Sequence, residues 1–406
     1  MKRRVVVTGM GLVAGNARDH RSFAKLCFEG KGSIGTCTAF DPYGLSTPYF
    51  GEVMGCTPED APNARFHGLL AASAENLLRD AGLTREEIAA WGTRCRMFFG
   101  TLIFSSDLFY RHSLRKRAQE SEADDFIAHM NDFSAHAKNL LGVKGSVTVL
   151  SSSCAAGTTA AGMAMDYIRS GVCDRAIVGG VDALSVVTAY GFNALKSLSS
   201  GVTNPFDEER DGINIGECGV FFLFESLDAA EARGAEILGE IAGYALGNDA
   251  YHITSPRPDG EGAYRVMREA LADAGITPED IGYINVHGTG TQVNDAMEIK
   301  AVEKLFGDVS HEIALSSTKA LLGHCMGASG AIELASVLLS LHMSAYLPMP
   351  HLKNSIARAP HLRLSDKSFE LDAGYALKNS FAFSGNSASL VVRRYGKEVE
   401  DESRIC

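Results

Sequence analysis

The apolar positions of the chain form two kinds of segment, short continuous runs and longer stretches with helical spacing. Continuous runs bounded by glycine or serine are typical of strands buried on both faces. In the first half they occur at residues 3–13, 96–104, 145–153 and 174–184. Two other stretches, residues 68–82 and 155–171, end at glycine and predict helices. The first half is therefore predicted to be an alternating α/β segment.

The alternation restarts after about residue 245 and continues to the end of the chain. The restart contains further helix-like and strand-like segments at residues 262–275, 281–291, 297–307, 313–323, 327–344 and 378–395. Residues 151–168 and 316–339 resemble each other faintly, because both pass from serines into a Gly/Ala-rich helix. Helices that are apolar all round suit the centre of a layered core. We predict two similar halves, residues 1–245 and 246–406.

Composition and charge restrict the class of protein. The chain has 406 residues, of which 46% are hydrophobic, which predicts a folded protein with a substantial core. The formal net charge of −11 argues against nucleic-acid or anionic-membrane binding as the main activity. We find no signal-peptide pattern and no uninterrupted apolar stretch long enough to span a bilayer, so we expect a cytoplasmic protein with no membrane partner.

The cysteines and the first glycines predict no disulfide, metal or dinucleotide site. The nine cysteines include no CxxC pair and no Cys/His cluster with metal-ligand spacing. Gly9, Gly11 and Ala14 match the pattern G-x-G-x-x-A after a predicted strand. The second strand that should follow is replaced by a loop at residues 27–36. We interpret the glycines as a turn that lets the chain pass close to the sheet.

Cys154 lies where the run at residues 145–153 meets the Gly/Ala-rich helix. A cysteine at a helix N-terminus is exposed to the positive end of the helix dipole, which lowers the thiol pKa. This position predicts a nucleophile. The alternative is a small buried core residue, the ordinary role of a single cysteine.

Two histidines and a lysine occur in similar places of the second half. His287 directly follows the predicted strand at residues 281–286, with Gly288 and Gly290 around it. Lys319 and His324 immediately precede the second Gly/Ala-rich helix. A single histidine is usually structural. Two in matching contexts, with a cysteine in a third, favour a catalytic set.

These residues resemble the β-ketoacyl-acyl carrier protein synthases, specifically the elongating ketosynthase II type. The similarity covers nearly the whole chain and includes residues 5–13, 204–219, 248–256, 286–295, 319–330 and 379–390, with the cysteine turn. Thiolases and initiating synthases differ at the second histidine. The resemblance implies the thiolase fold, in which two similar halves form an α-β-α-β-α layered core, and a dimer.

The resemblance also implies roles for the matching residues. Cys154 would carry the acyl chain as a thioester, and His287 and His324 would stabilise the enolate formed from malonyl-acyl carrier protein. Phe383 would supply an oxyanion N–H and a gate. Thr289 and Thr291 would contact the phosphopantetheine arm, which belongs to the carrier protein, so that the enzyme itself would bind no cofactor and no metal.

Supporting roles follow from the same resemblance. Lys319 would pair with Glu298 to hold the histidine region, a plain structural ion pair being the alternative. The acyl pocket would include Leu102, Ile103 and Phe192, with Leu102 narrowing it. An acidic carrier protein would dock on basic side chains. The candidates are Lys196, Arg115, Lys116 and Arg117, although most charge runs are simply solvated.

The chain departs from the family pattern at three places and leaves the pathway open. Residues 381–389 replace a glycine-rich loop, Cys325 stands where an apolar residue is common, and residues 100–106 are bulkier than usual. The product could serve fatty-acid synthesis or a specialised polyketide or polyene pathway, with a homodimer or a heterodimer. A second function is a non-catalytic chain-length factor, but such subunits lack the cysteine. A third, a thiolase, needs a second cysteine in a glycine-rich setting, which Cys406 does not have.

Overall fold

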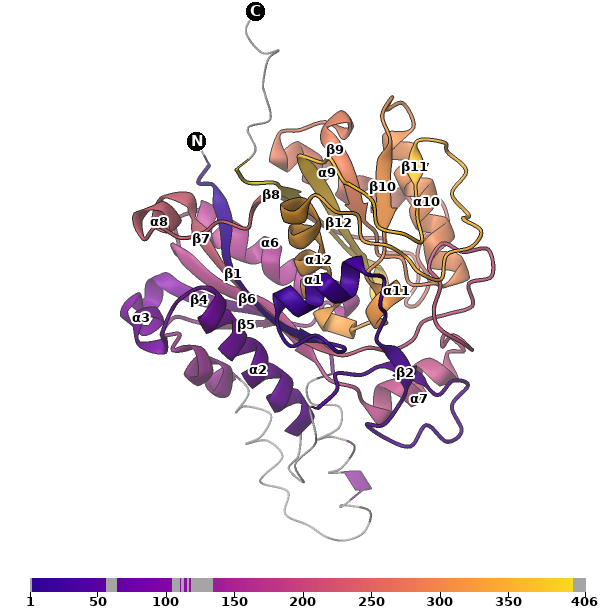
Figure 1. Cartoon of the computed structure of the whole chain (residues 1–406), viewed down its shortest axis with the longest axis horizontal. Coiled ribbons are helices and arrows are strands. Elements are labelled where there is room, and N and C mark those ends of the chain that lie inside the picture. The colour runs from indigo at the N-terminus through magenta and orange to yellow at the C-terminus, as the bar shows by residue number, and fades with distance from the viewer. Residues whose placement is uncertain are drawn as a thin grey trace, which may run out of the picture.

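A computed structural model describes residues 2–55, 64–103, 110, 113–114, 117 and 134–396. The main sheet formed by these residues has the strand order β11-β10-β9-β12-β13-β8-β1-β7-β6-β4-β5. A small separate sheet pairs β2 (Ile34–Thr36) with β3 (Tyr49–Gly51). Figure 1 shows the indigo-to-magenta elements of the first half beside the orange-to-yellow elements of the second.

The two halves repeat one strand pattern. In the first, β4 pairs in parallel with β5 and β6, and β7 lies antiparallel to β6 and β1. In the second, β9 pairs in parallel with β10 and β12, and β13 lies antiparallel to β12 and β8. The strands are β1 (Val5–Ala14), β4 (Cys95–Gly100), β5 (Val147–Leu150), β6 (Arg175–Asp182), β7 (Cys218–Ser226), β8 (Gly239–Asn248), β9 (Ile281–Asn285), β10 (Ile313–Ser316), β11 (Leu362–Arg363), β12 (Tyr375–Phe381) and β13 (Asn386–Arg393).

The helices form three layers around the sheet regions. Buried α6 and α12 contact each other and strands of both halves, whereas α2 covers β1 and β7, and α9 covers β8 and β13. The fold is thus the expected α-β-α-β-α arrangement. The α-helices are α1 (His20–Phe28), α2 (Ala64–Asp80), α3 (Arg85–Ala90), α6 (Ala156–Arg169), α7 (Val186–Ala194), α8 (Leu227–Ala232), α9 (Glu261–Ala274), α10 (Gln292–Phe306), α11 (Lys319–Leu322) and α12 (Ser329–Met343). Short 3₁₀ turns are η1 (Gly92–Arg94), η2 (Ser153–Ala155), η3 (Pro278–Asp280), η4 (Met326–Ala328) and η5 (Phe383–Gly385).

The expected boundary at residue 245 falls inside β8. This strand pairs with β13 along most of its length and with β1 only through Glu240 and Gly239. By strand pairing, β8 belongs to the second half. Strand pairing alone would thus divide the chain between β7 and β8, and the boundary at residue 245 stays a prediction.

The central helices touch through glycines. A Cβ atom at Gly157 of α6 would lie 2.7 Å from the backbone nitrogen of Ala331, and one at Gly330 of α12 would lie 2.3 Å from the backbone nitrogen of Thr158. Real side chains do not approach backbone this closely. The small residues that predicted a close helix pair therefore serve that purpose.

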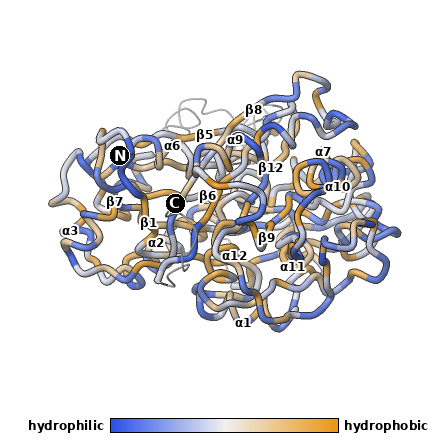
Figure 2. The backbone as a smooth tube through the Cα atoms, turned by 90° about the horizontal axis from the view of Figure 1, so that it is seen from above, coloured by the Kyte–Doolittle hydropathy of each residue, from blue (hydrophilic) through white to orange (hydrophobic). Residues whose placement is uncertain are grey.

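Among the described residues, one helical segment, Met326–Met343, is long and apolar enough to cross a membrane, but 89% of it is buried inside the fold. The segment contains Glu333 and His342, so it does not contradict the expectation that no uninterrupted apolar stretch is long enough to span a bilayer. A core helix explains it, because α12 is enclosed by strands of both halves. Figure 2 shows apolar stretches running through the interior, with hydrophilic stretches frequent in the outer loops.

The glycines near the N-terminus lie within β1, not in a turn. A Cβ at Gly11 would lie 2.0 Å from the backbone nitrogen of Leu77 in α2, and one at Gly9 would lie 2.8 Å from Cβ of Ala81. Their role is to let α2 approach the strand. The interpretation of a turn is wrong, but the expected close approach of backbone is present.

Candidate active site

Cys154 lies on the short turn η2 between β5 and α6. Ser153, just before it, has a φ of 53°, a left-handed conformation that costs a non-glycine residue free energy. The turn points Cys154 into a cavity, where the side chain is only 5% exposed. Because of this strained turn, the thiol lies in the same cavity as the site residues of the second half.

Burial raises the pKa of the Cys154 thiol to about 12, and the nearby Lys319 cation only partly opposes this. The expectation that the helix N-terminus would lower the thiol pKa is therefore wrong in direction. Removing the thiolate from water outweighs the partial positive charge of the helix end. The thiol is protonated at neutral pH, and its reaction requires that this proton be lost.

His287 directly follows β9 and Val286. The Glu298 carboxylate on α10 accepts hydrogen bonds from the backbone N–H groups of His287, at 2.8 Å, and Gly288, at 2.9 Å. Gly288 has a φ of 39°, and a Cβ there would lie 2.7 Å from the Phe206 ring. Glu298 thus fixes the backbone that carries the histidine. Its burial raises its pKa to about 7.

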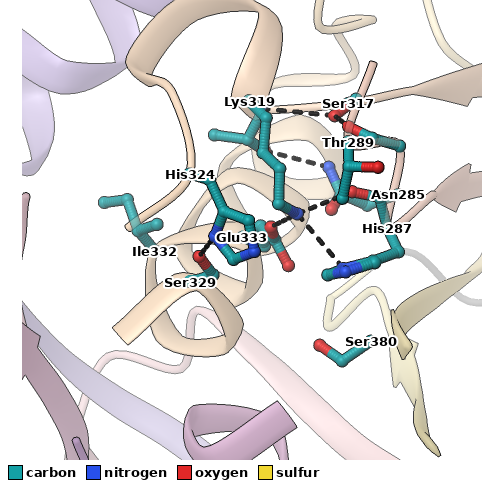
Figure 3. A network of polar contacts seen from close by, with 12 residues as sticks. Asn285, His287, Thr289, Ser317, Lys319, His324, Ser329, Ile332, Glu333 and Ser380 are labelled. Atoms are coloured by element: carbon teal, nitrogen blue, oxygen red, sulfur yellow. Dashed lines mark hydrogen bonds and ion pairs between the residues drawn. The ribbon is translucent and has the colours of Figure 1, made fainter. Parts of the chain in front are cut away.

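Lys319 does not pair with Glu298. Its ammonium group forms a buried ion pair with Glu333 of α12, donates to the backbone oxygen of His287 at 2.6 Å, and lies 3.3 Å from Nδ1 of that histidine. Figure 3 shows the lysine extended between Glu333 and His287. The predicted partner was wrong because backbone N–H groups already occupy Glu298. The predicted role, holding the histidine region, agrees with these contacts.

His324 follows the short helix α11. Its Nδ1 accepts a hydrogen bond from the backbone N–H of Met326 at 3.1 Å and lies 2.8 Å from the Ser329 hydroxyl, a contact also drawn in Figure 3. A ring nitrogen that accepts a hydrogen bond carries no proton. A neutral His324 therefore holds its proton on Nε2.

Both histidines are neutral in the resting site. Burial lowers the pKa of His287 and of His324 well below the usual value, and the Lys319 and Lys378 cations lower both further. Because the Lys319 ammonium faces Nδ1 of His287, this ring also keeps its proton on Nε2. The ring centroids are 5.7 Å apart. The pair can thus offer two N–H donors to one oxygen atom.

A cavity of about 250 Å³ joins these groups. Cys154, His287 and His324 line it, together with Thr289 and Thr291. The two threonine hydroxyls lie 2.9 Å apart. Thr254, Ser255, Pro256 and Asn294 also line the cavity. The structure therefore brings the predicted nucleophile, both histidines and both predicted pantetheine contacts to one space.

Phe383 and Phe192 form one wall of the cavity. Their rings stack with centroids 5.7 Å apart. Ser384 follows with a φ of 65°, and its N–H donates to the backbone oxygen of Ile253 at 2.7 Å. A serine in this left-handed conformation has less freedom than glycine. The loop is thus anchored on the segment that contains Asp249 and Thr254.

Leu102 and Ile103 do not line this cavity among the described residues. Leu102 is 39% exposed, whereas Ile103 is buried beside Met326 and Ile213. Asp182 accepts the N–H groups of both residues, at 2.9 to 3.1 Å, and so turns this segment aside. Of the three predicted acyl-pocket residues, the structure therefore places only Phe192 at the cavity.

The predicted docking residues lie in two places. Lys196 is exposed between Leu195 and Ser197, both of which line the cavity, so it stands at the entrance. Arg117 is exposed. Arg115 and Lys116 lie outside the described residues.

Sequence reasoning missed Glu333 and Lys378, two charged side chains that are 1% and 0% exposed. Each stands inside an otherwise apolar or small-residue element, which is a signal that could have been used, because buried charges are rare unless paired. Asp182 was also missed, and its burial raises its pKa to about 6. The described part of the chain contains no cluster of three or more His, Cys, Asp or Glu side chains able to hold a metal.

Two family models match the chain. The β-ketoacyl synthase N-terminal domain matches residues 2–230, and the C-terminal domain matches residues 238–353. The chain therefore belongs to the β-ketoacyl synthase family, a family of condensing enzymes. The predicted fold and enzyme class are thereby confirmed.

Curated relatives are similar to this chain over nearly its full length. The chain is 33% identical to the 3-oxoacyl-[acyl-carrier-protein] synthase 2 of Staphylococcus aureus strain COL, over 97% of this chain and 99% of the relative. It is also 33% identical to the synthase of the same name from a Synechocystis species, again over 97% and 99%.

Solved structures with the same fold include ketosynthases from polyketide systems. One is a type II polyketide ketosynthase complexed with its acyl carrier protein and bound to a hexaketide, with a TM-score of 0.88, 30% identity, and coverage of 98% of this chain and 100% of that one. Another is the ishigamide ketosynthase/chain length factor, with a TM-score of 0.85, 30% identity and the same coverage.

Proposed function

We propose that the protein catalyses decarboxylative Claisen condensation of an acyl chain with malonyl-acyl carrier protein to give a β-ketoacyl-acyl carrier protein. The observation that carries this proposal is the convergence of the Cys154 thiol and two neutral histidines on one cavity. A nucleophile beside preorganised N–H donors suits acyl transfer followed by enolate stabilisation.

In the first step the Cys154 sulfur attacks the thioester carbonyl of an acyl-carrier protein. The bond to the pantetheine sulfur breaks, and the departing thiolate takes up the proton that Cys154 loses. Backbone N–H groups of Cys154 and Phe383 hold the tetrahedral oxyanion. Because burial raises the pKa of the Cys154 thiol, the proton leaves this thiol during the attack and passes to the departing pantetheine sulfur.

In the second step malonyl-carrier protein occupies the same cavity. Thr289 and Thr291 contact the pantetheine arm, and Nε2–H groups of His287 and His324 donate to the malonyl thioester oxygen. Carbon dioxide leaves with cleavage of its carbon–carbon bond, and the electron pair stays on the resulting enolate. The enolate carbon attacks the Cys154 thioester, and the sulfur departs and is reprotonated. The enzyme needs no cofactor of its own for these steps.

The partners that we propose are an acyl carrier protein and a second ketosynthase-type subunit, which is either an identical copy or a chain-length factor. Lys196 at the cavity entrance suits an acidic carrier protein. β5 is an edge strand of the main sheet, and its Val149 side chain is 42% exposed. An apolar edge strand is a natural site for pairing with another subunit. We place the enzyme in the cytoplasm, in fatty-acid or specialised polyketide or polyene synthesis.

The test is intact-protein mass spectrometry after incubation with a panel of acyl-carrier proteins. The parent enzyme gains one acyl mass, and Cys154→Ala gains none. Cys27→Ala, which removes another buried thiol, is the matched control and still gains the acyl mass. An acyl adduct on Cys154→Ala would show that the nucleophile lies elsewhere, and a parent enzyme that takes up no acyl group would favour a chain-length-factor role.

A further inference from the structure

Lys378 is a second fully buried lysine of the site, for which the proposed reaction has no role. It lies on β12, where alternate residues face opposite sides of the sheet. Ala376, Lys378 and Ser380 face the central helices, whereas Leu377 and Asn379 face α9 and α10. The ammonium group thus enters the central layer between the two halves.

The polar contacts of Lys378 connect it to the residues that lie next to Cys154 and His287. The ammonium donates to the Thr158 hydroxyl on α6 at 2.6 Å and to the Ser380 hydroxyl, and it lies 2.9 Å from a carboxylate oxygen of Glu333. Thr158 is in the first turn after Cys154. The other carboxylate oxygen of Glu333 is bound by Lys319, which touches His287. One carboxylate is therefore shared by two buried cations.

Burying an ammonium group costs free energy unless charge and hydrogen bonds compensate. A small side chain on β12 would leave Lys319 and Glu333 as a balanced pair, so Lys378 is not needed to neutralise the carboxylate. It instead adds one positive charge beside both histidines. A second buried cation beside a carboxylate that Lys319 already neutralises is a mark of a functional site.

We propose that Lys378 is a positioning residue whose charge, held beside the shared Glu333 carboxylate, helps burial and Lys319 to keep His287 and His324 in their neutral, Nε2–H form. This inference rests on the proposed function, because it concerns the donors that would stabilise the enolate. If a histidine took up a second proton, its Nδ1–H would face a donor, the Lys319 ammonium at His287 or the Met326 N–H at His324. The rings would then have to turn away.

The charges around Lys378 come from several elements. Glu333 on α12, Lys319 on α11 and Glu298 on α10 act on its ammonium, and burial lowers the pKa of Lys378. Its own charge lowers the pKa of both histidines, after burial and the Lys319 charge. With Lys378 removed, the histidine pKa values rise, and protonation reaches the site at higher pH. The decarboxylation rate of malonyl-acyl carrier protein falls as the pH is lowered, and we call this part of the pH–rate profile the acid limb. Without Lys378 the acid limb therefore shifts to higher pH.

The experiment measures release of carbon dioxide from malonyl-acyl carrier protein between pH 5 and pH 9 for the parent enzyme, Lys378→Met and Lys378→Arg. We expect the acid limb of Lys378→Met to lie roughly one pH unit above that of the parent, as for loss of one buried charge. Lys378→Arg keeps the charge and keeps the parental limb, even if its maximal rate falls. Lys378→Gln, which retains a hydrogen-bond donor, shows the same shift as Lys378→Met and replaces it if that variant does not fold.

Ser380→Ala is the matched control, because it removes a hydrogen-bond partner of Lys378 without changing the charge. Its limb stays at the parental pH. An unchanged limb in Lys378→Met, or a shift of equal size in Lys378→Arg, would overturn the proposal. A parent enzyme that releases no carbon dioxide would instead count against the proposed function, so the two failures are distinguishable.

Discussion

The turns that precede α6 and α12 occupy equivalent places in the two halves. Each follows a parallel strand and passes through a 3₁₀ turn, η2 or η4, into a buried Gly/Ala-rich helix. Both 3₁₀ turns begin with a non-glycine residue in the left-handed region, Ser153 with a φ of 53° and Met326 with a φ of 48°. The same strained local geometry has therefore been kept in both halves.

The residues that this geometry presents are different. The second residue of η2 is Cys154, whereas the second residue of η4 is Gly327. A Cβ at Gly327 would lie 2.7 Å from the backbone nitrogen of Leu102, so the second half has no room for a nucleophile there. Only residues 151–152 separate β5 from η2, but residues 317–325 separate β10 from η4 and contain Lys319 and His324. One turn presents Cys154, the proposed nucleophile, and the longer segment before the other turn holds Lys319 and His324, the proposed hydrogen-bond donor.

The strongest test of this division of labour is His324→Ala. We expect decarboxylation of malonyl-acyl carrier protein to fall by about 10²–10³-fold, as for loss of one preorganised donor to a developing oxyanion. Acyl transfer to Cys154, measured by mass spectrometry, should persist. His361→Ala, in the loop before β11, is the control and should leave both steps unchanged. Equal loss of the two steps in His324→Ala would contradict the division.

Gly327→Ala tests whether the second turn excludes a side chain. The new Cβ has to push the backbone of residues 101–102 and the Asp182 carboxylate, so we expect a loss of about 1–3 kcal/mol in the free energy of unfolding. Denaturant unfolding measures this. Gly68→Ala on the exposed side of α2, where a Cβ meets nothing within 4 Å, should instead stabilise by about 0.4–1 kcal/mol. Equal effects of the two changes would argue against the steric explanation.

Lys196→Glu examines the approach to the first-half turn. Because Lys196 is exposed at the cavity entrance, reversing its charge should raise KM for carrier-bound substrate about tenfold at low salt. Its salt dependence should become flatter, since one attractive charge has been lost. Lys353→Glu, another exposed lysine, serves as the control. An unchanged KM at low salt would refute the docking role.

Lys319→Met tests whether a charge in the second half affects the pKa of Cys154 in the first half. The Lys319 charge lowers the pKa of the Cys154 thiol, which burial raises to about 12, so the variant should have a still higher thiol pKa. Alkylation of Cys154 by iodoacetamide should accelerate with pH across pH 7–10 in the parent, because the thiolate fraction grows below the pKa. The variant should react a few times more slowly at each pH. Lys304→Met, at an exposed position of α10, should match the parent. A parental rate that levels off near pH 8 would contradict the raised pKa.

The smallest effect concerns acyl preference within the first half. Phe192→Ala removes a ring that stacks on Phe383 at the cavity wall, so we expect the range of acyl chains accepted by Cys154 to widen toward longer saturated chains. Leu102→Gly should change this range less, because Leu102 does not line the cavity. Mass spectrometry across saturated chains of increasing length compares them. A wider range in Leu102→Gly alone would restore the pocket role that the sequence predicted.

The sequence predicted the fold, and it singled out three residues that the structure brings to one cavity, because both depend on local order. Cys154, His287 and His324 each follow a predicted strand, and such strand ends converge in a layered α/β fold. The ion-pair partner of Lys319 could not be predicted from positions relative to the strands. Glu298 lies on the helix before Lys319 and Glu333 on the helix after it, and only the structure shows that backbone N–H groups already bind Glu298.

Burial explains why the expected direction of the Cys154 pKa shift was wrong, and one turn explains why Leu102 does not line the cavity described, although its acyl-pocket role stays a prediction. The helix position of Cys154 argued for a lowered thiol pKa, but the desolvation that opposes it depends on the second half closing over the turn. Leu102 follows a buried strand and was therefore placed in the pocket. Asp182, which is distant in sequence, binds the backbone of residues 102–103 and sends Leu102 outward.

The glycine contact between α6 and α12 also bears on how the chain folds. All residues of α12 from Ser329 to Leu341 are buried, and the helix packs against strands of both halves. A second half synthesised alone would therefore expose this apolar helix to water and aggregate. Because the contacts that close the core join residues far apart in the chain, folding should be slow and cooperative across both halves. The boundary that separates the halves in sequence is thus no boundary in stability.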